Sequence, residues 1–299
     1  MKTLLLTLLL IPMMSFGQNV YIPDANFKFV LVVNTSINTN GDSEIQVSEA
    51  SAFTGNINCY GLSISDLTGI EAFTALTSLA CGFNQLTSLD VSSCTALTTL
   101  YCENNQLTSL DVSNNNALTS LGCENNQLTS LDVSNNNALT ELYCYNNQLT
   151  SLDVSNNTAL TYLNCGDNQL TSLDVSSNTA LTFLSCYDNQ LECLNVKNGN
   201  NTLIYLLYAV NNPTLTCIEV DDENYSTTNW TDIDSQTSFS TDWCINCSIL
   251  PLDITELNNT PKQLIKIVDV LGRETPFKPN TPLLYIYDDG TVERKVVLK

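Results

Sequence analysis

Residues 118–138, LTSLGCENNQLTSLDVSNNNA, decide the fold, because residues 139–159, LTELYCYNNQLTSLDVSNNTA, repeat them almost letter for letter. The period is 139 − 118 = 21 residues. A unit this short cannot bury its own apolar face, so the repeat predicts a solenoid whose coils stack and share one core. Units begin at Leu76, Leu97, Leu118, Leu139, Leu160 and Leu181, with a decayed unit from Leu203 and a divergent one over residues 57–75.

Each unit contains one short strand pattern. Leu121 and Cys123 alternate with polar residues at period two, as a half-buried strand requires, and successive strands would stack about 4.8 Å apart in a parallel sheet. Three residues after the cysteine stands an asparagine, which we expect to satisfy backbone groups in a buried ladder. The two columns are Cys81, Cys102, Cys123, Cys144, Cys165, Cys186 and Asn84, Asn105, Asn126, Asn147, Asn168, Asn189.

The pattern Leu118-x-x-Leu121-x-Cys123-x-x-Asn126-x-Leu128 resembles the leucine-rich repeat family, and the resemblance covers the middle half of the chain. It implies a mainly β solenoid of parallel β coils over residues 51–220. The same pattern recurs within the unit, from Leu128 to Asn136. We therefore expect a second extended stretch in each coil instead of a helix.

Charge restricts the partners. The net charge is −21, from 31 acidic and 10 basic residues, and no Lys or Arg lies between Lys28 and Lys197. An anionic body should repel nucleic acid and anionic lipid, whose binding depends on Lys and Arg, and should attract basic surfaces. The chain has no His, and it contains no Ser/His/Asp or Cys/His set and no phosphate loop. We therefore expect that the chain is not an enzyme.

The chain has twelve cysteines, a number that would suggest disulfides if the chain is exported. The six column thiols should point inward as small apolar groups and stay reduced, because parallel in-register neighbours are poorly placed for bridging. Cys217 should form a disulfide with Cys244 or with Cys247, and the spacing does not choose between them.

Both ends of the chain carry targeting signals. Residues 1–17 read as a signal peptide, with Lys2, an apolar run over residues 4–11 that is too short to span a membrane, and a small-x-small cleavage site. After a cap or linker over residues 221–247, residues 248–299 resemble the C-terminal sorting domain of type IX secretion cargo in Bacteroidetes, a small β-sandwich. Its signature is present as Lys266, Asp269, Gly272 and Arg273, and a hairpin follows over residues 283–298. The alternative is an ordinary β accessory domain.

Residues 18–50 should cap the first coil. A short helix is predicted from Asp24 to Val33, with Asp24 as N-cap. The loop that follows resembles an EF-hand calcium loop, whose oxygen ligands surround one ion, although Asn and Ser replace the usual Asp and Gly at positions one and six. The candidate Ca²⁺ ligands are Asn38, Asn40, Asp42, Glu44, Gln46 and Glu49. A polar turn is the alternative.

Sequence diversity is concentrated in three outward columns of the strand pattern. Tyrosine offers a large contact area with a polar tip at little entropic cost, and carboxylates suit basic groups. The candidate ligand-binding residues are Tyr101, Glu103, Glu124, Glu141, Tyr143, Tyr145, Tyr162, Phe183, Tyr187 and Tyr205. A second acidic column, from Asp90 to Asp174, is expected to be structural.

These features predict a secreted or cell-surface leucine-rich-repeat protein that binds a protein or a glycan through its strand face. The alternative is a structural or adhesive spacer with no specific ligand.

Overall fold

The computed structural model describes residues 17–242, 244, 264–268, 273–276, 283–287 and 292–295. It divides the chain into two compact units, residues 1–249 and 250–299. Nearly all of the predicted signal peptide, residues 1–16, lies outside the described residues. Among the described residues, no helix is both long enough and apolar enough to cross a bilayer.

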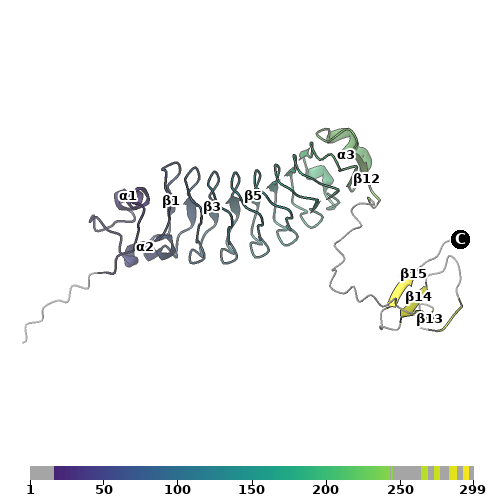
Figure 1. The fold of residues 1–299 in the computed structure, drawn as a ribbon, viewed down its shortest axis with the longest axis horizontal. Helices are drawn as coiled ribbons and strands as arrows, with labels where there is room; N and C mark the ends of the chain where they lie inside the picture. The colour runs from purple at the N-terminus through teal and green to yellow at the C-terminus, as the bar shows by residue number, and fades with distance from the viewer. Residues whose placement is uncertain are drawn as a thin grey trace, which may run out of the picture. The chain divides into compact units, whose positions relative to one another are not determined.

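Two short helices begin the first unit (Figure 1). The helix α1 spans Ala25–Val33, and Asp24 caps it by accepting from the N–H groups of Asn26 and Phe27, as predicted. The helix α2 spans Val47–Ala52 and begins with a capping box between Gln46 and Glu49. Phe27 and Leu31 are fully buried against the first coils, so this segment closes the open end of the core.

The coils that follow build an eight-stranded parallel sheet (Figure 1). Neighbouring coils pair in register, so that Ser120 stands opposite Glu141 and Glu141 opposite Tyr162. The strands, in sheet order, are β1 (Asn56–Asn58), β2 (Ser78–Ala80), β3 (Thr99–Tyr101), β4 (Ser120–Gly122), β5 (Glu141–Tyr143), β6 (Tyr162–Asn164), β8 (Phe183–Ser185) and β10 (Leu206–Tyr208).

A second parallel sheet occupies the other extended stretch of the last coils. Its order is β12-β11-β9-β7, with β7 at Ser172–Asp174, β9 at Cys193–Asn195, β11 at Cys217–Glu219 and β12 at Ser238–Ser240. The prediction of a second extended stretch is therefore confirmed where these strands form. Short 3-10 turns at Ile70–Ala72 and Asn201–Leu203 interrupt the coils.

The core contains the predicted leucine and cysteine columns. All six column cysteines are fully buried and free. The asparagine ladder is also confirmed. The Asn126 amide donates to the carbonyls of Cys102 and Cys123, both at 3.1 Å, and its oxygen accepts from Leu107 N–H at 3.0 Å. Equivalent bonds recur at every step from Asn84 to Asn212, so the ladder ties each coil to the one before it.

The last coil is covered by a segment that includes a helix absent from the sequence-based prediction, α3 (Glu223–Asn229). Trp230 is buried beneath it and donates from its indole N–H to the Ile204 carbonyl at 3.0 Å. Cys217 bridges to Cys244, which settles the alternative left open by the spacing. Trp243 and Cys247 lie outside the described residues.

The second unit contains a three-stranded antiparallel sheet in the order β13-β14-β15. The strands are β13 (Leu264–Val268), β14 (Leu283–Tyr287) and β15 (Val292–Lys295). The predicted pairing of the last two strands is confirmed. Asp269 and Gly272 of the sorting signature lie outside the described residues.

Candidate functional site

The outer surface of the eight-stranded sheet, named the strand face here, consists of three side-chain columns. In each strand the central residue, such as Leu142, is fully buried, and its two neighbours point outward and are mostly half-buried. A third column follows the buried cysteines. The columns are Ser78, Thr99, Ser120, Glu141, Tyr162, Phe183, Leu206; then Ala80, Tyr101, Gly122, Tyr143, Asn164, Ser185, Tyr208; and Gly82, Glu103, Glu124, Tyr145, Gly166, Tyr187.

The structure brings nine of the ten predicted ligand-binding residues into these columns. Tyr205 is the exception, because Leu206 stands opposite Phe183. The interval from Phe183 to Leu206 is 206 − 183 = 23 residues, whereas the prediction assumed 205 − 183 = 22, so it misplaced the tyrosine by one position. Tyr205 is 69% exposed beside the column, with its ring centroid 6.1 Å from that of Phe183.

Aromatic rings stack from coil to coil on this face. The Tyr143 and Tyr162 rings lie 4.7 Å apart, and those of Tyr162 and Phe183 lie 4.0 Å apart and nearly parallel, at 3°. Tyr187 and Tyr208 form a neighbouring pair at 5.3 Å. Because in-register strands place the rings one above another, each stacked ring covers its neighbour's face and leaves its edge to solvent.

Carboxylates precede the aromatic stack. Ser120 Oγ donates to Glu141 Oε2 at 3.1 Å, and since this uses the only hydroxyl proton of the serine, the Tyr101 O–H donates to Ser120 Oγ at 3.0 Å. Glu103 and Glu124 lie side by side in adjacent coils. One oxygen of each, Oε2, is buried and has no hydrogen-bond partner among the described residues.

Burial controls the protonation of these two acids. It raises the pKa of Glu124 to about 7, and the nearby Glu103 carboxyl adds to that rise. Burial also raises the pKa of Glu103. The strand face therefore holds two acids that give up their protons less readily than exposed glutamates do.

Glycines shape the surface beneath these side chains. A Cβ at Gly82 would lie 2.5 Å from the Glu103 carboxyl, and a Cβ at Gly166 would overlap the Tyr187 ring. The glycines therefore let larger side chains of the next coil lie flat across them.

Sequence reasoning missed two aromatic residues at the start of the strand face. Tyr60 and Phe83 are 47% and 50% exposed, with ring centroids 4.8 Å apart. Phe83 has φ 55°, in the left-handed region, where the next coils carry Asn104, Asn125 and Asn146. A bulky residue rarely adopts this conformation. The signal that could have found it is this replacement of Asn by Phe within an otherwise regular column.

The candidate calcium ligands are only partly assembled. Asn40, Asp42 and Gln46 converge, with Asn40 Nδ2 donating to Gln46 Oε1 at 2.7 Å and to Asp42 Oδ2 at 3.1 Å. Asn38 instead donates to backbone carbonyls, and Glu44 pairs with Lys28 at 2.6 Å. The described residues contain no group of three or more Cys, Asp or Glu side chains placed to hold a metal.

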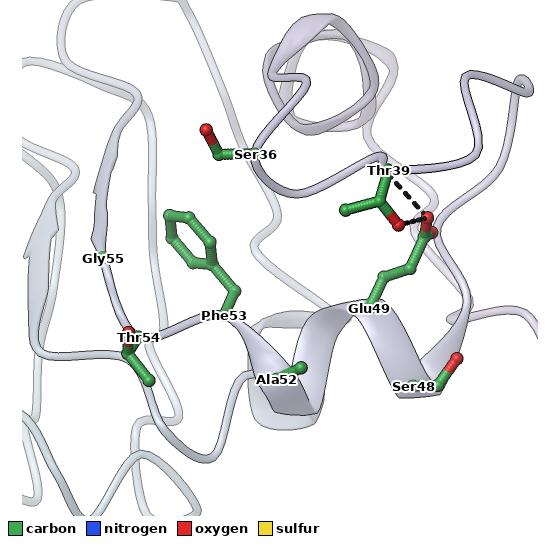
Figure 2. A pocket seen from close by; sticks show the side chains of 8 residues that line it. All are labelled: Ser36, Thr39, Ser48, Glu49, Ala52, Phe53, Thr54 and Gly55. Atoms are coloured by element: carbon green, nitrogen blue, oxygen red, sulfur yellow. Dashed lines mark hydrogen bonds between the residues drawn. The ribbon is translucent and has the colours of Figure 1, made fainter.

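The Glu49 carboxylate is also held by hydrogen bonds within the loop. It accepts from Thr39 N–H and Oγ1, Asn40 N–H and Gln46 N–H. Burial opposes ionisation, but these bonds outweigh it and lower the pKa of Glu49. Figure 2 shows the two Thr39 bonds to Glu49 among the side chains that line a hollow. The volume of this hollow is about 540 Å³. The hollow is lined by Ser36, Thr39, Ser48, Glu49, Ala52, Phe53, Thr54 and Gly55.

The outward aspartate column has a structural role, as expected. Each aspartate accepts from the backbone N–H two residues on, for example Ser134 N–H to Asp132 at 2.9 Å. At Asp90, the Ser92 hydroxyl and backbone N–H both donate, and they lower the pKa of the carboxyl. These bonds shape the turn that leads out of the second extended stretch.

Comparison with known proteins supports the repeat assignment. The family described as leucine-rich repeats (2 copies) matches residues 74–115 and 137–178. Internalin J of Listeria monocytogenes (serotype 4b, strain F2365) is 36% identical over 75 residues, which are 25% of this chain and 8% of that protein. The match thus spans under a tenth of the relative's length.

Solved structures extend the comparison. Internalin C2 from Listeria monocytogenes shows the same fold, with a TM-score of 0.55 over 76% of this chain and 99% of that one at 17% identity. The functional domain of InlJ from the same species, described as including a cysteine ladder, is 28% identical over 68% of this chain and 62% of that one, with a TM-score of 0.32. This chain therefore carries leucine-rich repeats in its sequence and adopts the leucine-rich-repeat solenoid.

Proposed function

We propose that this chain is a protein-binding module and that the strand face is its binding surface. One observation carries the proposal. The inward positions repeat Leu, Cys and Asn from coil to coil, whereas the outward columns vary and gather aromatic and carboxylate side chains. A purely structural spacer needs the inward repeats but has no use for a varied outer surface.

The ring geometry favours a protein over a glycan. A sugar stacks its apolar side on the open face of an aromatic ring, but Tyr162 and Phe183 cover each other's faces at 4.0 Å. Ring edges and tyrosine hydroxyls suit the mixed apolar and polar contacts of a protein surface. The absence of Lys and Arg between Lys28 and Lys197 further favours a partner with a basic patch.

The function test compares two triple variants of the full mature chain. Tyr143→Ala/Tyr145→Ala/Tyr187→Ala alters the strand face, and Thr108→Ala/Thr129→Ala/Thr150→Ala alters exposed positions outside it. A partner is first identified by cross-linking on intact cells, purified, and titrated against each variant. We expect the tyrosine variant alone to bind at least 100-fold more weakly. Equal affinities would support the spacer instead.

We further propose that the chain is exported and displayed at the cell surface. The predicted signal peptide, residues 1–17, and the resemblance of residues 248–299 to type IX sorting domains support this location. Fractionation of cells making the full chain or a chain ending at residue 247 tests it. The full chain should reach the medium or outer surface, and the shortened chain should stay in the periplasm. Equal export would contradict the sorting role.

Calcium binding by the loop of residues 38–49 is a separate proposal. Its support is the convergence of Asn40, Asp42 and Gln46, whose oxygens are the kind that Ca²⁺ prefers. Glu49 would have to leave its present hydrogen bonds to complete the site.

A further inference from the structure

The hollow of about 540 Å³ in the N-terminal cap lies outside the strand face and has no part in the proposed function. Its walls come from the loop after α1, from the helix α2 and from residues 53–55, which lead into β1. Figure 2 shows the Phe53 ring on one side and the Thr39–Glu49 pair on the opposite side. The hollow therefore has one apolar and one polar wall, which suits a small ligand with the same two kinds of surface.

The apolar wall is the ring of Phe53, which is only partly buried. The ring lies against Gly55, since a Cβ there would fall 2.6 Å from the Phe53 Cζ atom. The Phe73 ring meets it at an interplanar angle of 87°, with ring centroids 6.4 Å apart. These contacts hold the Phe53 ring in place and leave part of it exposed along the hollow. The rings of Tyr162 and Phe183, in contrast, cover each other's faces.

The polar wall contains a carboxylate that can accept a further hydrogen bond. Glu49 Oε1 accepts three bonds, from Thr39 N–H, Thr39 Oγ1 and Asn40 N–H, at 2.8, 2.9 and 3.2 Å. In the described part of the chain, Oε2 accepts one bond, from Gln46 N–H at 3.1 Å. Each carboxylate oxygen has two lone pairs, so Oε2 has room for a donor from a ligand.

Three hydroxyl groups complete the polar lining. The hydroxyls of Ser36, Ser48 and Thr54 are exposed and make no hydrogen bond to another described residue. Each can donate one bond and accept others. No Lys or Arg lies among the residues that line the hollow, so it offers no charge to a phosphate, sulfate or carboxylate ligand.

We propose that this hollow binds a neutral sugar ring. A pyranose has a face of C–H groups, which packs on an aromatic ring, and hydroxyls that both donate and accept. Its C–H face would lie on Phe53, one of its hydroxyls would donate to Glu49 Oε2, and the serine and threonine hydroxyls would bond the others. The inference goes beyond the proposed function, and neither depends on the other, because the hollow and the strand face share no residue.

The test titrates the full mature chain with the methyl glycosides of glucose, galactose, mannose and N-acetylglucosamine. EDTA is present, so that calcium cannot draw Glu49 away from the hollow. NMR of chain with carbon-13-labelled phenylalanine rings reports contact, and Phe53→Leu assigns the Phe53 signals. We expect saturable shifts of the Phe53 ring with at least one glycoside. Sorbitol, which has hydroxyls but no ring, and cyclohexylammonium, which has a ring and a cation but no hydroxyl, should cause none.

Two matched variants place a bulky side chain at neighbouring exposed positions of α2, and only the first of these positions lines the hollow: Ala52→Trp and Ser51→Trp. Ala52→Trp should abolish glycoside binding in saturation-transfer NMR, and Ser51→Trp should bind as wild type does. Phe53→Leu should bind about tenfold more weakly.

The inference is overturned if no glycoside gives a saturable shift, or if sorbitol or cyclohexylammonium binds as well as the glycosides. It is also overturned if both tryptophan variants bind alike. Failure of the proposed function has a separate signature, since it is read from the affinity of the protein partner for the tyrosine variant of the strand face.

Discussion

Replacing Asn126 by Ala tests the ladder that holds the coils in register. The substitution leaves the buried Leu107 N–H with no other acceptor in the described part of the chain, because Asn126 Oδ1 is its partner at 3.0 Å. The carbonyls of Cys102 and Cys123 each keep one other side-chain donor, Asn105 and Asn147. The Glu124 carbonyl, at 3.3 Å, also loses the Asn126 amide. One orphaned donor costs about 1–3 kcal/mol and three weakened acceptors add to this, so we expect a loss of about 2–4 kcal/mol.

Urea unfolding followed by circular dichroism measures this loss, with Gln127→Ala as the matched control. Gln127 is the next residue and its side chain is exposed, so its substitution should change the unfolding free energy by about 0.5 kcal/mol or less. Asn126→Asp should be at least as damaging as Asn126→Ala, because it directs a carboxylate at the two carbonyl oxygens. The reasoning is refuted if Asn126→Ala and Gln127→Ala unfold at the same urea concentration.

Three further predictions follow from burial and charge. Burial raises the pKa of Cys123 and Cys144 well above the usual thiol value. Iodoacetamide at pH 8 should therefore modify these residues only after unfolding, which mass spectrometry would show. Modification of the folded protein would contradict the inward position of the thiols. Because the folded pKa of Glu124 is raised from 4.5 to about 7, its protonation stabilises the fold below pH 4.5 and this contribution is lost as pH rises through 7. Thermal melts at pH 5 and pH 8 should therefore show that wild type loses stability over this range relative to Glu124→Gln. After allowance for solvent screening, the difference in unfolding free energy between the two proteins should change by about 1–2 kcal/mol in favour of the variant. The same difference at both pH values contradicts this. Millimolar CaCl₂ should raise the melting temperature of the wild type but not of Asp42→Asn, and no shift rejects the calcium loop.

The structure of the coil was predictable because the same residue pattern recurs in every unit. Each inward position recurs every 21 residues, so a chance pattern at one Leu or Cys would not persist from Leu76 to Leu181. The asparagine ladder was predictable for the same reason. Because buried backbone N–H and C=O groups need hydrogen-bond partners, the asparagine side chains could be expected to supply them. The outward position of the ligand-binding columns then followed from the period of two in a strand.

Features that occur once were not predictable in this way. The decayed coil has two extra residues, which shifted Tyr205 out of the column assigned to it. The helix α3 has no copy elsewhere with which to compare it. The burial of Glu103 depends on a glycine in the preceding coil, Gly82, and the stacking of Tyr162 on Phe183 depends on side-chain angles. Such cross-coil contacts become visible only when the coils are placed side by side.

The most direct test of the binding surface is the affinity of a purified partner for the Tyr143→Ala/Tyr145→Ala/Tyr187→Ala chain relative to wild type, measured by calorimetry at pH 8. The strand-face account predicts at least a 100-fold loss, with the threonine control within twofold of wild type. Equal affinity for all three chains would contradict it and would place recognition outside the strand face.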